Sequence, residues 1–103
     1  MTPYILHSNV RKFLKTLPHD LKNKTSEQLL ALQTFGRLLA PPDSKKISKV
    51  LFELRVVGSI QVRLLYGFSE NRALVIHGFV KKSEKIPPRE LDLAHKRFRE
   101  FAV

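Results

Sequence analysis

Two arginines lie in segments that alternate polar and apolar residues, as β-strands with one buried face do. Arg55 falls within residues 50–57 and Arg63 within residues 60–68. If the apolar positions face a core, Glu53, Arg55 and Arg63 point to the opposite side of the sheet. Guanidinium groups match phosphate oxygens two at a time, so two of them on neighbouring strands favour phosphate recognition. A cross-strand ion pair with Glu53 is the competing interpretation.

A third strand-like segment, residues 73–81, carries His77, Phe79 and Lys81 at alternate positions. Cations beside an aromatic ring are the usual composition of a site for single-stranded RNA. The alternation of side chains along this strand does not by itself show which face of the sheet His77 occupies. His77 is therefore either a packed, hydrogen-bonded residue or one that contacts substrate and takes part in catalysis. We expect the other histidines, His7, His19 and His95, at the surface or at helix caps.

Other chemistries have little support in the sequence. There is no cysteine, no HExxH pair and no group of acids suited to two divalent ions, so we expect no metal site. There is no P-loop or GxGxxG motif, so we expect no nucleotide cofactor. No serine occupies a nucleophile elbow.

Net charge is the strongest feature of the composition. Nineteen lysines and arginines stand against nine acids in 103 residues, a formal net charge of +10. A domain this basic usually has an anionic partner, here nucleic acid, a ribosome or an acidic protein, although a surface charged for solubility is the simpler alternative. The lack of cysteine, of a secretory leader and of a long apolar run predicts a cytoplasmic protein that does not enter a membrane.

The patterns predict a single α+β domain. A short edge strand is expected at residues 3–7, then a helix capped by Ser8, and a second helix that Pro18 opens and Pro41-Pro42 stops. Three strands in an antiparallel meander follow, and Pro87-Pro88 opens a C-terminal helix. We therefore expect an N-terminal helix pair packed on one face of a small twisted antiparallel sheet, with the other face partly open.

Four motifs follow one another in the second half of the chain. They are Glu53-Leu54-Arg55, Arg63 to Tyr66 (RLLY), Phe79 to Lys82 (FVKK), and Ser83 through Pro87 to Glu90 (SEKIPPRE). With the preceding FGRLLAPP, this order resembles the HigB-like branch of the RelE/ParE toxin superfamily, many of whose members are phage-derived. The resemblance covers nearly the whole chain, and it implies one RelE-like toxin domain over residues 1–103.

The resemblance also implies a function. RelE-like members are toxins of type II toxin–antitoxin pairs that cut messenger RNA, typically in the ribosomal A site and without a metal. We expect attack by the 2′-hydroxyl of the RNA, with an antitoxin of helix-turn-helix or acidic type as protein partner. A ParE-like toxin that binds DNA gyrase, and an RNA-binding module without catalysis, are the alternatives. Relatives often use a tyrosine near the C-terminus, and this chain has none after Tyr66.

Two sets of site residues are expected. The predicted catalytic residues are Arg55, Arg63, Lys81, Lys82 and, from its strand position, His77. The residues expected to bind RNA around them are Lys45, Lys46, Lys49, Phe79, Lys85 and Arg89.

Overall fold

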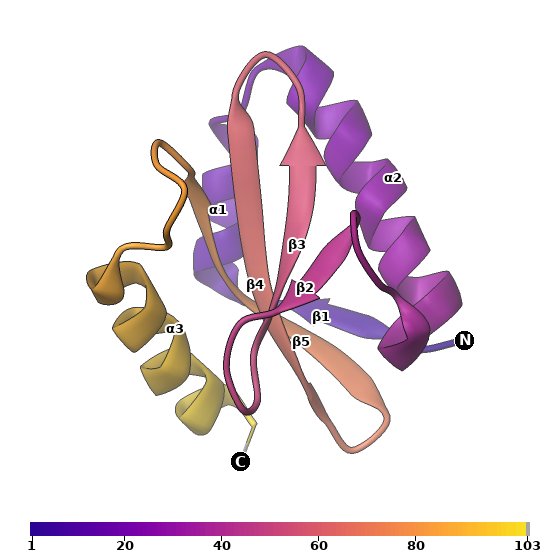
Figure 1. The fold of residues 1–103 in the computed structure, drawn as a ribbon. Coiled ribbons are helices and arrows are strands. Elements are labelled where there is room, and N and C mark those ends of the chain that lie inside the picture. The colour runs from indigo at the N-terminus through magenta and orange to yellow at the C-terminus, as the bar shows by residue number, and fades with distance from the viewer. Residues whose placement is uncertain (103) are drawn as a thin grey trace.

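A five-stranded sheet with helices on both faces organises the chain in the computed structural model, which describes residues 1–102 (Figure 1). The elements are β1 (Tyr4–Leu6), α1 (Ser8–Lys15), α2 (His19–Phe35), a 3-10 turn η1 (Gly36–Leu38), β2 (Ser44–Lys46), β3 (Phe52–Val57), β4 (Gln61–Ser69), β5 (Arg72–Val80) and α3 (Pro88–Phe101). The strands lie in the order β1-β5-β4-β3-β2.

The helix boundaries follow local chemistry. Pro18 and Pro87 directly precede α2 and α3, where a missing backbone N–H costs nothing. His7 caps α1, because its Nδ1 accepts the Asn9 N–H at 3.1 Å, so Ser8, the expected cap, is the first helical residue instead. Gly36 ends α2 with a positive φ of 52°, a backbone conformation that favours glycine.

The predicted helix-pair-on-sheet arrangement is wrong. The β3-β4-β5 meander is antiparallel as expected, but β2 extends it beside β3, and β1 pairs parallel with β5 to make a mixed sheet. Helix α3 also covers the face opposite α1 and α2, so the helices are not an N-terminal pair packed on a small sheet in the RelE-like manner. The edge strand expected at residues 3–7 is present as β1, but its parallel pairing with β5 was not expected, and β2 is too short to show a periodic pattern.

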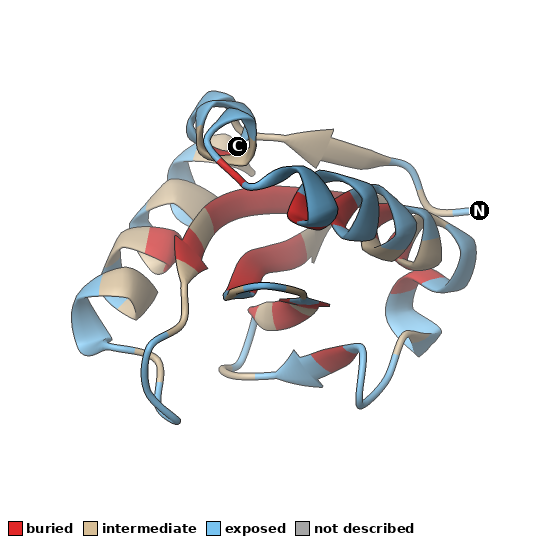
Figure 2. Cartoon of the chain, turned by 90° about the horizontal axis from the view of Figure 1, so that it is seen from above, coloured by how far each residue is buried: buried red, intermediate tan, exposed pale blue. Residues whose placement is uncertain are grey.

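The core has two layers, one on each side of the sheet. On one side α1 and α2 bury Val10, Leu21 and Leu32 against strand residues such as Leu54 and Leu64. The second cluster joins α3 to the other side through Leu51, Leu65, Leu74, Ile76, Phe79 and Ala94. Figure 2 shows the central strands buried between helices whose outer faces are exposed.

Helix α3 therefore limits the sheet surface that remains accessible. It packs on β5 and reaches β4, which leaves the second face of β3 outside its cover. Within residues 1–102, no helix is both long and apolar enough to span a bilayer.

Candidate functional site

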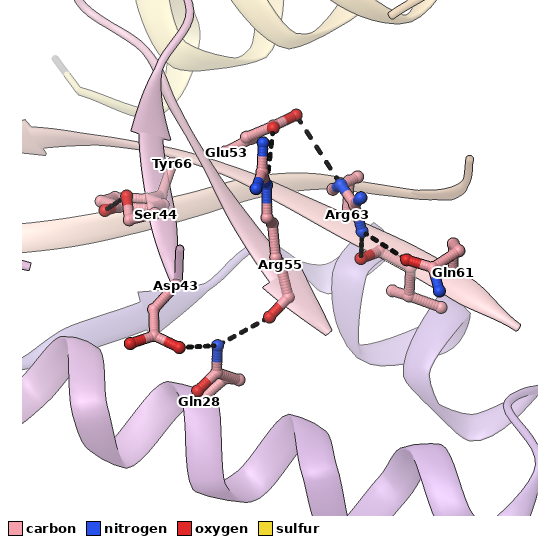
Figure 3. A network of polar contacts seen from close by, with 9 residues as sticks. Gln28, Asp43, Ser44, Glu53, Arg55, Gln61, Arg63 and Tyr66 are labelled. Atoms are coloured by element: carbon pink, nitrogen blue, oxygen red, sulfur yellow. Dashed lines mark hydrogen bonds and ion pairs between the residues drawn. The ribbon is translucent and has the colours of Figure 1, made fainter. Parts of the chain in front are cut away.

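Arg55 and Arg63 face each other across β3 and β4 in the sheet register. Glu53 lies between their guanidinium groups, as Figure 3 shows. Its Oε1 is 3.3 Å from the Arg55 Nε, and its Oε2 is 3.9 Å from the Arg63 Nε. All three side chains lie on the sheet face opposite α1 and α2. The alternation of polar and apolar residues in the sequence predicts this side.

The two arginines differ in burial. The Arg55 side chain is 33% exposed, whereas that of Arg63 is only 9% exposed. Arg63 donates from Nη1 to the Val62 carbonyl at 3.0 Å, but neither its buried Nε nor Oε2 of Glu53 has a hydrogen-bond partner within residues 1–102. Desolvation lowers the pKa of Arg63, Glu53 opposes that shift and Arg55 adds to it. The pair of arginines thus keeps one positive charge more than Glu53 neutralises.

Further cations lie beside Glu53 and Arg63 in two adjoining hollows, whereas Arg55 lines a third hollow together with Lys24 and Gln28 of α2. One, of about 320 Å³, is lined by Lys45, Lys46, Ile47, Glu53, Lys81, Glu84, Lys85, Ile86 and Leu91. The other, of about 500 Å³, is lined by Gln61, Arg63, Lys81, Lys82, Ser83 and Glu84. Lys81 belongs to both hollows, and its N–H bonds to the Gln61 carbonyl at 2.8 Å, which holds the chain after β5 against β4. We call Lys45, Arg55, Arg63, Lys81 and Lys82 the cationic face.

The remaining predicted RNA-binding residues are distributed around this face. Lys45 lies directly opposite Glu53 in the sheet register, and Lys85 lines the first hollow. Lys46 also lines it, with its Nζ 5.9 Å from the ring centre of Phe52. Lys49 and Arg89 are exposed, but they lie outside the lining of both hollows.

His77 lies beneath α3. The Arg97 Nη1 can only donate, so it must donate to Nδ1 of His77, 2.7 Å away. The other nitrogen, Nε2, therefore carries the proton and donates to Glu90 at 2.8 Å. Burial lowers the pKa of His77, Arg97 lowers it further, and Glu90 partly offsets both. The ring is thus a neutral link between β5 and α3.

An irregularity in the β4–β5 register at Leu65/Tyr66 explains this orientation. It lets Ile76 and His77, neighbours in sequence, both contact the α3 side of the sheet. Phe79 lies on that side too, 6% exposed, with its ring stacked on that of His77 at 5.8 Å between centroids. The structure therefore places His77 and Phe79 in the packing of α3, although Phe79 is the direct cross-strand partner of Arg63 and so borders the cationic face.

Sequence reasoning did not identify the parts of the molecule that support Arg55. Gln28 of α2 donates from Nε2 to the Arg55 carbonyl at 2.7 Å and to Oδ1 of Asp43 at 3.3 Å (Figure 3). The Arg55 N–H bonds to the Asp43 carbonyl at 2.9 Å. These contacts fix the backbone of Arg55, and with it the position from which its guanidinium group extends. The ion pairing of Glu53 with the two arginines, the competing interpretation of the sequence, is present in the structure, whereas Gln28 gives no sequence signal.

Two further observations define the chemistry near the site. Tyr66 bonds to Ser44 and packs in the α1/α2 layer, and burial raises the pKa of its phenol. Its hydroxyl therefore lies apart from the cationic face. Across residues 1–102, no group of three or more His, Asp or Glu side chains is placed to hold a metal ion.

A comparison with protein families finds one match. The model of a family described as phage derived protein Gp49-like (DUF891) matches residues 12–99, which include every element from within α1 to the last turns of α3. No curated protein matches the chain.

Proposed function

The chain belongs to the Gp49-like family of phage-derived proteins, a family of the RelE/HigB-like toxin type, and from this premise we propose that it is an RNA endonuclease. In this proposal it is the toxin of a type II toxin–antitoxin pair and cuts messenger RNA on the ribosome in the cytoplasm. The observation that carries the proposal is the convergence of Arg55 and Arg63 on one buried carboxylate within a face otherwise rich in lysine.

The reaction that suits this face begins with the RNA itself. The 2′-oxygen attacks the adjacent phosphorus, the bond from phosphorus to the 5′-oxygen breaks, and the products carry a 2′,3′-cyclic phosphate and a 5′-hydroxyl. A protein accelerates this by removing the 2′-proton, by stabilising the extra negative charge on phosphorus, and by protonating the leaving oxygen.

Arg55 and Arg63 are assigned to the charge on phosphorus. They are fixed in place before substrate arrives, and preorganised donors stabilise a transition state better than donors that must reorganise. Glu53, at 2% exposed, is a positioning residue that holds both guanidinium groups. Lys81 and Lys82, which line the hollow beside Arg63, are assigned to proton transfer and to binding the flanking phosphates.

His77 is left out of this assignment. Both of its ring nitrogens are engaged by α3 residues, so it has no free site for a proton from RNA. Phe79 is likewise covered, and we assign it to packing.

Controlled expression in a bacterial host tests the proposal against its two rivals. An RNA endonuclease arrests growth with rapid loss of full-length messages, and Arg55→Ala abolishes both effects. A gyrase-binding toxin would instead induce DNA damage with messages intact. A non-catalytic RNA-binding module would leave message length unchanged in wild type and variant alike.

A further inference from the structure

The third hollow, of about 260 Å³, lies beside Arg55 at the edge of the sheet. β2 pairs with β3 only from Phe52 to Leu54, so among residues 1–102 no strand lies beside the rest of β3 on that side. Helix α2 and the segment before β2 take that place. The hollow is lined by Lys24, Glu27, Gln28, Pro42, Asp43, Arg55 and Val57.

This hollow adjoins the cationic face through β3. Arg55 and Val57 are two residues apart on that strand, so their side chains point to the same face of the sheet. Val57 is 53% exposed, and Pro42 on the opposite wall is exposed as well. Two residues of a strand span about 6–7 Å, which is comparable to the reach from a phosphate group to the base of the same nucleotide. A phosphate at Arg55 can therefore place its base in the hollow.

The charges of the hollow suit a base better than a second phosphate. Lys24 and Arg55 are balanced by Glu27 and Asp43, whereas lysines and arginines outnumber acids in the two other hollows. A ligand with its own donors and acceptors gains more from such a lining than an anion does. Bases of single-stranded RNA are read in this way, by hydrogen bonds to their Watson–Crick edges.

Asp43 is held in place before any ligand arrives. Its N–H donates to the Ala40 carbonyl at 3.1 Å, and its own carbonyl accepts the Arg55 N–H at 2.9 Å. Its Oδ1 accepts from Gln28 at 3.3 Å, as Figure 3 shows. A carboxylate offers about four acceptor positions, so this contact leaves most of them available, and the residue is exposed.

A carboxylate selects among the four bases by their donors. Guanine presents two neighbouring donors, N1–H and the 2-amino group, and a carboxylate accepts two parallel N–H bonds well. Adenine and cytosine place an acceptor beside their amino group, and uracil has one N–H between two carbonyls. The O6 of guanine, next to N1, needs a donor, and a lysine ammonium can only donate.

We propose that the third hollow binds a guanine base of the RNA. Asp43 accepts from N1–H and the 2-amino group, Lys24 donates to O6, and Val57 and Pro42 provide apolar contact. The proposal rests on the proposed function, since it names the base beside the phosphate that Arg55 holds. Cleavage is then selective for sites with guanine at this nucleotide.

Binding of uncleavable RNA tests the proposal independently of catalysis. The probes are two 2′-O-methyl uridine strands, one with a single guanine and one with inosine in its place, which lacks only the 2-amino group. We expect the wild-type chain to bind the guanine strand roughly 3- to 10-fold more tightly, the value of one hydrogen bond to a charged group. Equal affinity for the two strands would overturn the proposal.

Asp43→Asn assigns the discrimination to the carboxylate. The amide keeps the shape, and its oxygen can still accept from Gln28, but one acceptor becomes a donor that opposes the donors of guanine. The affinity ratio between the two strands should fall to about one. Asp92→Asn, at an exposed residue of α3 outside all three hollows, should keep the wild-type ratio. A wild-type ratio in Asp43→Asn would remove that residue from the site.

Lys24→Met tests the contact to O6. Inosine also carries O6, so this variant should weaken binding of both strands equally and leave their ratio unchanged. Unweakened binding of both strands would overturn the role of Lys24.

Cleavage by the same chain separates this proposal from the proposed function. A chain that cuts RNA but binds both strands equally overturns the guanine site alone. A chain that prefers the guanine strand but does not cut RNA overturns the proposed function alone.

Discussion

Arg55 and Arg63 are direct partners in the β3–β4 register, with their side chains on the same face of the sheet. Like charges in this position repel, and Glu53 offsets the repulsion by pairing with both. One carboxylate cannot neutralise two guanidinium groups, so we expect the arrangement to bind a further anion. In the proposed function, a phosphate that enters the cationic face completes the pairing.

Alanine at either arginine should abolish RNA cleavage, but the two variants should differ in stability. Arg55 is partly exposed, so Arg55→Ala should change the free energy of unfolding little. Arg63 is buried, and Arg63→Ala should cost about 1–3 kcal/mol. Urea unfolding and message cleavage measure the two effects. Full cleavage by Arg55→Ala would remove that residue from the site.

Glu53→Gln should expose the repulsion between the arginines. The amide keeps the shape but removes the negative charge, so the free energy of unfolding should fall by about 1–3 kcal/mol. Added inorganic phosphate should then raise the melting temperature of the variant more than that of wild type, because the anion replaces the lost carboxylate. Equal shifts in both proteins would contradict an anion site between Arg55 and Arg63.

The link through His77 predicts that acid weakens the fold. Burial lowers the pKa of His77 below its ordinary 6.5, so below that pH the unfolded chain binds a proton that the folded chain does not. The free energy of unfolding should therefore fall as the pH drops from about 6.5 toward the pKa of His77 in the folded chain. Protonation of Nδ1 would also replace its hydrogen bond with Arg97 by repulsion between two positive charges. Glu90, on the other nitrogen, limits the effect.

Unfolding curves at pH 7.5 and 5.5 measure this loss. His77→Gln should show a smaller loss than wild type, whereas His19→Gln, at an exposed position, should behave like wild type. A pH dependence that His77→Gln leaves unaltered would assign the effect to another group, such as His7, whose pKa burial also lowers.

The alternation of residues along β3 and β4 predicted the correct sheet face for Glu53, Arg55 and Arg63, because side chains of an unbroken strand point alternately to the two faces. The same reasoning could not place His77, since the irregularity opposite Leu65/Tyr66 breaks the alternation. The sheet itself was underestimated. The edge strand at residues 3–7 was predicted, but nothing in its sequence indicates that it pairs parallel with β5, and Ser44–Lys46 is polar throughout and shows no alternation.

The helices were also only partly predictable from the sequence. Apolar spacing located α1, α2 and α3, but spacing along one helix carries no information about which sheet face it covers. That choice depends on long-range packing, such as Ala94 against the Leu65 side of the sheet. The supporting contact from Gln28 to the Arg55 carbonyl joins residues 27 positions apart, and it has no local signature.

Lys45 should contribute to RNA affinity without reading sequence. Lys45→Ala should weaken binding of single-stranded RNA uniformly and reduce the salt slope by about 0.7, the value for one phosphate contact on a single strand. Uncleavable RNA with 2′-O-methyl groups allows the measurement, and Lys96→Ala, on the exposed side of α3, is the control. An equal change in slope for both variants would indicate general charge effects only.

The chemical ends of the cleaved RNA test the central claim most directly. Purified chain is mixed with messenger RNA and ribosomes in buffer that contains a chelator of catalytic transition metals, and the new termini are identified by mass spectrometry. A 2′,3′-cyclic or 3′-phosphate opposite a 5′-hydroxyl, lost when the scissile nucleotide carries deoxyribose, is the predicted result. A 5′-phosphate product, or cleavage at the deoxyribose position, would contradict attack by the 2′-hydroxyl on the cationic face.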